Sequence, residues 1–118
     1  MKSLKCAAFT DALIPVEVES TFVRGLPGFN IVGLAGTTIK ESESRVKAAL
    51  MSLNFKFPAS KIIINLSPSD TPKNGSHFDL AIALLIALQK ERIDGDFFVF
   101  GELGLDGSLK STASLFSI

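Results

Sequence analysis

The chain has 118 residues, which fits a single domain, and 47% of them are apolar, which excludes a disordered segment. Twelve basic and twelve acidic residues give a formal net charge of zero, which argues against a domain that grips nucleic acid by overall charge but leaves room for a local basic patch. One cysteine excludes an internal disulfide, and the apolar stretches are too short for a signal peptide or a membrane span, so we expect a cytoplasmic protein without a membrane partner.

The first third of the chain predicts three strands. Residues 4–9 form a short apolar run in which Cys6 fits a buried packing thiol, and residues 14–23 alternate in part between apolar and polar side chains. A segment dense in turn formers leads to a third strand at residues 29–34, in which Gly33 predicts a bulge or the close approach of another backbone.

A helix is predicted over residues 39–53, because its apolar side chains recur on one helical face. Thr38 and Glu41 fit a capping box at its start, and Asn54 is expected to end it. Glu41 and Arg45 form an i,i+4 pair, which is typical of a solvated helix face.

The second half of the chain predicts further strands and one more helix. Residues 61–66 are β-branched and apolar, which indicates a central strand covered on both faces. Residues 78–88 predict a buried helix and residues 97–103 another strand, after which Asp106 and Gly107 form a turn toward a partial last strand. The order β-β-β-α-β-α-β predicts an α+β fold, a sheet with two helices.

The junction between residues 61–66 and 78–88 is the natural place for a site, because a helix start leaves backbone N–H groups free. Ser76 fits the N-cap in a capping box with Asp79, and His77 fits a surface residue of the first turn. Adjacent side chains diverge by about 100°, so Ser76 and His77 do not form a nucleophile–base pair. Asp79 is interpreted as a structural anchor whose partners are free N–H groups and Lys73, and less readily as a catalytic acid or a contact with another chain.

Nucleotide and metal sites are not visible in the sequence. No Gly-x-x-x-x-Gly-Lys-Ser/Thr motif occurs. His77 and Cys6 are the only histidine and cysteine, and the two carboxylates Asp70 and Asp79 do not make a cage for a hard cation. We therefore assign no catalytic, cofactor-binding or metal-ligating residue to this chain.

Five basic residues of the chain are candidates for a binding surface. They are Arg24, Lys56, Lys61, Lys73 and Lys110, and no aromatic residues interleave with them in the manner of RNA-binding modules. Ordinary solvated charges are the simplest interpretation. The alternative is a contact with DNA or with another subunit through Arg24, Lys56, Lys61 and Lys73.

Several consecutive motifs resemble one known family. They lie at residues 27–34, 40–50, 63–70, 75–80 and 100–107. Together they are similar to the N-terminal domain of Mg-chelatase-like AAA+ proteins of the bacterial competence type, the ComM/YifB family. The similarity spans nearly the whole chain.

The resemblance implies a fold, an architecture and a process. The fold would be that of ribosomal protein S5 domain 2, shared with the proteolytic domain of Lon, and residues 1–118 would be the N-terminal domain of a longer protein. An AAA+ module that uses ATP and Mg²⁺ would follow and assemble as a hexameric ring, so the partners would be this module, neighbouring subunits and DNA. The family is associated with DNA branch migration in natural transformation.

The Lon-like junction of this chain would comprise Lys73, Gly75, Ser76, His77 and Asp79. In Lon the nucleophilic serine lies two residues past the glycine, where this chain has a histidine. The position of the Lon lysine base falls near Phe116, which cannot move a proton. The resemblance therefore implies a Lon-like scaffold without Lon chemistry.

Three hypotheses follow for the function. The first is a non-catalytic accessory domain of a ring ATPase. The second is a degenerate peptidase with residual activity at Ser76. The third, which is compatible with the first, is an autonomous nucleic-acid-binding module that uses Lys56, Lys61 and Lys73.

Overall fold

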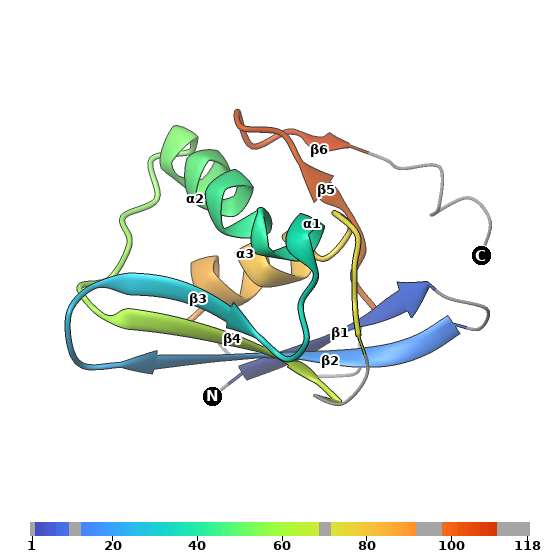
Figure 1. Cartoon of the computed structure of the whole chain (residues 1–118). Helices are drawn as coiled ribbons and strands as arrows, with labels where there is room; N and C mark the ends of the chain where they lie inside the picture. Colours follow the sequence, from blue (N-terminus) through green and yellow to red (C-terminus); the bar gives the residue numbers. More distant parts are fainter. Residues whose placement is uncertain (1, 10–12, 69–71, 92–97, 111–118) are drawn as a thin grey trace.

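The computed structural model describes residues 2–9, 13–68, 72–91 and 98–110. Within them the chain forms six strands and three helices (Figure 1). In chain order these are β1 Lys2–Phe9, β2 Leu13–Val23, β3 Gly28–Val32, α1 Thr37–Lys40, α2 Ser42–Ser52, β4 Lys61–Ser67, α3 Asp79–Ala87, β5 Glu102–Leu103 and β6 Leu109–Lys110.

Four strands form one mixed sheet in the order β1-β2-β4-β3. The long strand β2 pairs antiparallel with β1 on one side and with β4 on the other, with Val18 opposite both Leu4 and Leu66. Strand β3 runs parallel to β4, with Ile31 opposite Ile64. The prediction of an α+β fold is confirmed, and so is the central position of β4.

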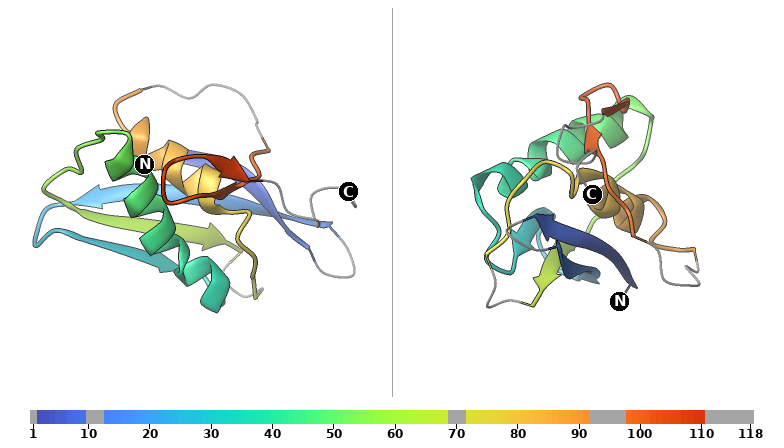
Figure 2. Two further views of the ribbon diagram at one scale, coloured as in Figure 1. Left: turned by 90° about the horizontal axis from the view of Figure 1, so that it is seen from above. Right: turned by 90° about the vertical axis from the view of Figure 1, so that its right-hand side faces the viewer.

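Both long helices lie on the same face of this sheet (Figures 1 and 2). The alternation in β4 explains this arrangement, because Ile62, Ile64 and Leu66 are buried while Ile63 and Asn65 are only half-buried. The prediction that β4 is covered on both faces was therefore wrong. A β-branched run is typical of a fully covered strand, but here one face of the sheet packs on helices and the other does not.

Helix α3 is the centre of the core. It is apolar nearly all round, and Ala81, Ile82, Leu85 and Ile86 are buried together with the preceding Phe78. This confirms the predicted buried helix. None of the helices in the described part of the chain is long and apolar enough to cross a membrane.

The helix expected over residues 39–53 is divided in two at Glu41, which separates α1 from α2. The predicted capping box was also wrong, because Gly36 is the N-cap of α1 and makes no side-chain cap bond. Thr38 lies inside the first turn, where its hydroxyl donates to Asn74 Oδ1 and accepts from the N–H of Gly75 at 2.9 Å.

Gly33 confirms the expectation of a close backbone approach. Its φ is +102°, and a Cβ added there would lie 2.2 Å from the carbonyl oxygen of Leu66. Only glycine permits this approach.

The C-terminal strand expected over residues 97–103 is shorter than predicted, and residues 92–97 lie outside the described part. The N–H of Val99 donates to the carbonyl of Lys5 at 2.8 Å, so this segment runs beside β1. Strands β5 and β6 then form the hairpin predicted around Asp106 and Gly107.

Candidate functional site

Lys73 is buried, with 2% of its surface exposed. Its ammonium donates to the carbonyl of Gly33 at 2.9 Å and to the carbonyl of Pro68. Its backbone also bonds to Leu34 and Gly36, so the residue fastens the loop before α3 to the end of β3. The expectations that Lys73 is a solvated charge, a DNA contact or a partner of Asp79 were wrong.

His77 is buried as well, with 3% exposure, so its prediction as a surface residue was wrong. The centroid of its ring lies 4.5 Å from the ring centroid of Phe78 and 6.4 Å from that of Phe100. Gly75, with φ +115°, makes this possible, because a Cβ at Gly75 would stand 2.6 Å from atoms of the imidazole. The backbone carbonyl of His77 also faces the buried thiol of Cys6 at 3.9 Å, which confirms the packing role of that cysteine.

Ser76 is not the N-cap of α3. The N-cap is Phe78, which has no side-chain cap bond, and the Ser76 carbonyl accepts from the N–H of Asp79 at 3.3 Å. The helix begins two residues later than a capping box at Ser76 would require.

Asp79 is fully buried and accepts four hydrogen bonds. Arg45 approaches it as a fork, with Nε 2.7 Å from Oδ2 and Nη2 3.0 Å from Oδ1. The hydroxyl of Ser42 donates to Oδ1, and the N–H of Leu103 donates to Oδ2 at 3.1 Å. The prediction of a structural anchor is confirmed, although its partners are not the expected ones.

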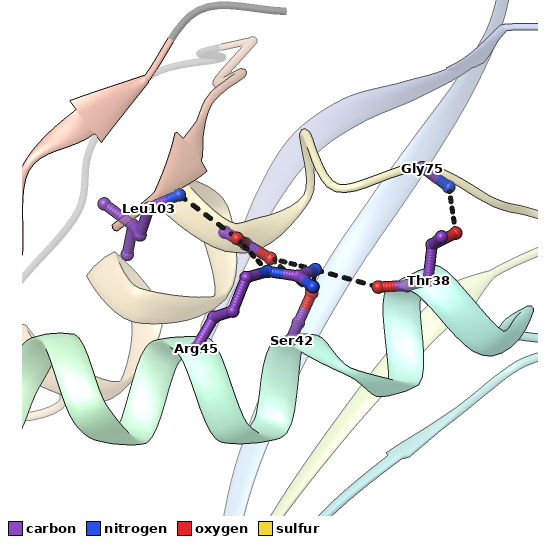
Figure 3. A network of polar contacts seen from close by, with 6 residues as sticks. Thr38, Ser42, Arg45, Gly75 and Leu103 are labelled. Atoms are coloured by element: carbon purple, nitrogen blue, oxygen red, sulfur yellow. Dashed lines mark hydrogen bonds and ion pairs between the residues drawn. The ribbon is translucent and has the colours of Figure 1, made fainter. Parts of the chain in front are cut away.

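This cluster joins four elements around one carboxylate. Arg45 Nη2 also donates to the carbonyl of Thr38 at 2.8 Å, so α1, α2, α3 and the β5–β6 hairpin share one network (Figure 3). The bond to Asp79 raises the pKa of Arg45 above its ordinary value, which burial opposes in part. The carboxylate is occupied by donors, so it holds the scaffold together and has no free oxygen to act as a base.

Arg45 and Ser42 were missed as partners of Asp79. The i,i+4 spacing placed Arg45 with Glu41 on a solvated face, whereas its guanidinium turns to the carboxylate of α3. A signal was present, because a lone carboxylate in an apolar helix requires a cation from elsewhere in the chain.

Among the described residues no group of three or more His, Cys, Asp or Glu gathers to hold a metal.

Three of the four predicted contact residues gather at one end of the sheet. Val23, the last residue of β2, lies opposite Lys61 of β4, which in turn lies opposite Gly28 of β3. Arg24 directly follows β2, and Lys56 lies in the loop that leads into β4, at the left of Figure 1. Arg24, Lys56 and Lys61 are all exposed. We call this region the basic end.

The basic end is built from segments without acidic residues. Residues 20–40 and 46–68 contain no Asp or Glu but include five Lys or Arg. The chain is neutral as a whole, so its negative charge lies elsewhere in the sequence. This imbalance could have been found in the sequence, and it identifies the predicted cations as a local positive surface.

A partly open groove of about 140 Å³ lies at the basic end. Its walls are mainly apolar, formed by Pro27, Phe29, Phe57, Pro58 and Ile62. Lys47 and Ser60 are the polar residues among those that line it. Sequence reasoning missed Lys47 and the two phenylalanines, because they come from three separate elements that only the fold brings together.

Comparison with known proteins places the chain in one family. A family model described as subunit ChlI of Mg-chelatase matches residues 18–118. The protein YifB of Escherichia coli is 38% identical over 107 residues, which cover 87% of this chain and 21% of YifB. The competence protein ComM of Haemophilus influenzae is 42% identical over 99 residues, which cover 80% of this chain and 19% of ComM.

A Lon protease of Leptospira interrogans is a more distant relative, 27% identical over 103 residues that cover 83% of this chain and 12% of the protease. The chain spans about a fifth of the length of YifB and ComM. The expected resemblance is confirmed: the chain belongs to the family of the Mg-chelatase subunit ChlI, as a relative of YifB and ComM.

Proposed function

We propose that this chain is a non-catalytic accessory domain of a Mg-chelatase-related AAA+ ATPase, and that its basic end contacts DNA. One of its relatives is named a competence protein, so the process that we propose is DNA processing during natural transformation, including branch migration. The observation that carries the DNA contact is the gathering of Arg24, Lys56 and Lys61, which come from two segments of the chain that contain no acidic residue.

The geometry of the junction before α3 supports a non-catalytic role. Lys73 is engaged by backbone carbonyls of Gly33 and Pro68, and Asp79 by its four donors. The Lon position of the serine carries His77, whose ring packs near those of Phe78 and Phe100. The expected counterpart of the Lon lysine, near Phe116, lies outside the described residues.

The remaining parts of the proposal concern the whole protein. The order of three strands, helices, a strand and a helix, together with the similarity to a Lon protease, supports the fold of ribosomal protein S5 domain 2. This chain has no P-loop motif, so we place ATP and Mg²⁺ in the remaining four-fifths of the protein, which would assemble as a cytoplasmic hexameric ring.

The DNA contact is tested by the salt dependence of binding. Anisotropy of a labelled single strand with the 118-residue chain is expected to give a slope of log K against log salt of about −2, if the three cations of the basic end neutralise phosphates. Lys56→Glu with Lys61→Glu is expected to flatten this slope and weaken binding. Lys110→Glu, which reverses an exposed charge on β6, is the control. Equal weakening by the control would contradict the proposal.

The non-catalytic role is tested by turnover. The purified chain is expected neither to hydrolyse ATP nor to cleave casein or fluorogenic peptides. Peptide cleavage that Ser76→Ala abolishes would revive the peptidase hypothesis.

A subunit contact is a second candidate, favoured by exposed leucines on the side of the hairpin. Leu53, Leu105 and Leu109 are 61%, 63% and 61% exposed, and Leu53 lies against the hairpin at Gly107. In the full-length protein, Leu105→Ser with Leu109→Ser is expected to weaken ring assembly measured by sedimentation velocity. Unchanged assembly would remove this candidate.

A further inference from the structure

The groove at the basic end has the size of one flat ring. Its volume is about 140 Å³. An apolar protein cavity of roughly 150 Å³ holds a benzene molecule. The rings of Phe29 and Phe57, together with Pro58, offer apolar surfaces on which such a ring can pack.

The charged residue that lines the groove is a cation, Lys47, and Glu43, one helical turn before it, accepts a hydrogen bond from the N–H of Ile31 at 3.2 Å. Every residue that lines the groove belongs to residues 20–40 or 46–68, the two segments that contain no Asp or Glu. Lys47 forms part of the wall, and Lys61 Cγ is 3.9 Å from the position of a Cβ on Gly28, another lining residue. Lys56 directly precedes Phe57 in the chain. A ligand that fits the groove therefore carries negative charge beside its ring.

We infer that the groove takes one unstacked base of a single DNA strand, while Lys47, Lys56 and Lys61 hold the adjacent phosphates. This rests on the DNA contact proposed above and adds a preference to it. Single-strand-binding proteins combine a cationic path for the backbone with aromatic surfaces for the bases. In a duplex the bases are paired and stacked, so they cannot enter a groove of this kind.

The inference is tested with three probes, of which the two single strands have the same number of phosphates. These are a labelled 12-mer of thymidine, a 12-mer of abasic sites and a duplex. The 118-residue chain is expected to bind the thymidine strand about fivefold to a hundredfold more tightly than the abasic strand, the range for one base stacked on an aromatic side chain. It is also expected to bind the thymidine strand more tightly than the duplex.

Two substitutions test the contribution of the groove to binding separately from that of the lysine charges. Gly28→Leu places a side chain on the groove wall, at a position where an added Cβ fits because its nearest neighbour is Lys61 Cγ at 3.9 Å. Phe57→Leu removes one ring and keeps an apolar side chain. Each is expected to abolish the preference for thymidine over abasic DNA. Val32→Leu, at the other end of β3, is the matched control and is expected to retain it.

The outcomes distinguish the inference from the proposed function. Equal affinity for the thymidine and abasic strands, with a salt slope that Lys56→Glu and Lys61→Glu reduce, would overturn the groove and leave the DNA contact standing. No binding of any DNA probe would overturn both. Displacement of the thymidine strand by an acidic peptide containing phenylalanine, but not by the same peptide with alanine, would show that the groove serves a protein segment and would also overturn the inference.

Discussion

At the scale of single residues, burial separates the charges that stabilise the fold from those that can bind a partner. Asp79 and Lys73 are almost fully buried and are bonded within the chain, whereas Arg24, Lys56 and Lys61 are exposed. A buried charge requires partners, because its transfer from water without them costs several kcal/mol. The two groups therefore have different roles although their sequence contexts look alike.

Removing the charge of Arg45 and removing that of Asp79 are expected to lower the free energy of unfolding by different amounts. Arg45→Met leaves a carboxylate with no exposed surface and no cation, so it should cost about 3–5 kcal/mol in the free energy of unfolding. Asp79→Asn should cost less, because the amide oxygen still accepts hydrogen bonds and the arginine side chain, 20% exposed, can reach water. Urea unfolding of both variants measures the difference.

The double variant is the control for this pair. Its cost should be smaller than the sum of the two single costs, since both charges are then removed together. A smaller loss for Arg45→Met than for Asp79→Asn would contradict the assignment of Asp79 as the buried anchor.

Gly33 is expected to tolerate no side chain. Gly33→Ala would place Cβ 2.2 Å from the Leu66 carbonyl oxygen at φ +102°, so it should lower the free energy of unfolding by at least about 2 kcal/mol. Gly28→Ala, whose Cβ meets only Lys61 Cγ at 3.9 Å, is the matched control and should change the free energy of unfolding little. Chemical denaturation compares the two, and equal effects would refute the close-approach explanation.

The sequence could not predict the hydrogen-bond partners of the two buried charges, Asp79 and Lys73. Asp79 was recognised as an anchor because it is the one charge in an apolar helix, but Arg45 lies 34 positions away. Lys73 reaches the carbonyl of Gly33 across 40 positions. Local spacing carries no signal for such contacts, so i,i+4 pairing and solvated charge were the wrong interpretations.

At the scale of elements, periodicity predicted more than cap chemistry did. All four strands of the main sheet, both long helices and the turn of the last hairpin were expected. Burial on one face sets a period of two in β2 and of 3.6 in α2, whereas β4 and α3 stand out as apolar runs and the hairpin by its turn residues. Both capping boxes were wrong, at Thr38 and at Ser76. Hydroxyl groups near a helix start also bond to neighbouring loops, as Thr38 does to Asn74, and the pattern alone does not separate the two uses.

The β5–β6 hairpin is expected to depend on pH through Asp106. The hydroxyl and N–H of Ser108 donate to its carboxylate at 2.7 and 3.0 Å and lower its pKa in the folded state. A lowered folded pKa stabilises the turn above the ordinary pKa of Asp106, and this stabilisation is lost as the pH falls through the lowered value. Ser108→Ala should raise the pKa of Asp106 part of the way, because the backbone donor stays. An NMR titration of the carboxyl carbon measures the shift, and an unchanged pKa would contradict the role of the hydroxyl.

At the scale of the whole molecule, the net charge is zero but positive and negative charges are distributed unevenly along the chain. The five cations of residues 20–40 and 46–68 have no carboxylate in the same segments, so the opposite charges lie on other parts of the chain. A molecule with this asymmetry can present a positive face to a polyanion although its formal charge is balanced.

Chromatography is expected to reveal this asymmetry. The chain should be retained on a cation exchanger at pH 7 in low salt, above its sequence pI of about 6.6, where an evenly charged protein would pass through. Lys56→Glu with Lys61→Glu should lower the eluting salt concentration by more than Lys110→Glu combined with Lys90→Glu, which makes the same change in net charge away from the groove lining. Equal shifts would indicate that the basic end does not act as one surface.

The bonds at the base of the hairpin have a mechanical consequence. Gly101 bonds to Leu80 and His77 of the α3 start, and Leu103 bonds to the carboxylate of Asp79. The hairpin is therefore joined to the helices by hydrogen bonds at its base. A displacement of the hairpin would load these bonds first and would be transmitted through them to α2 and α3.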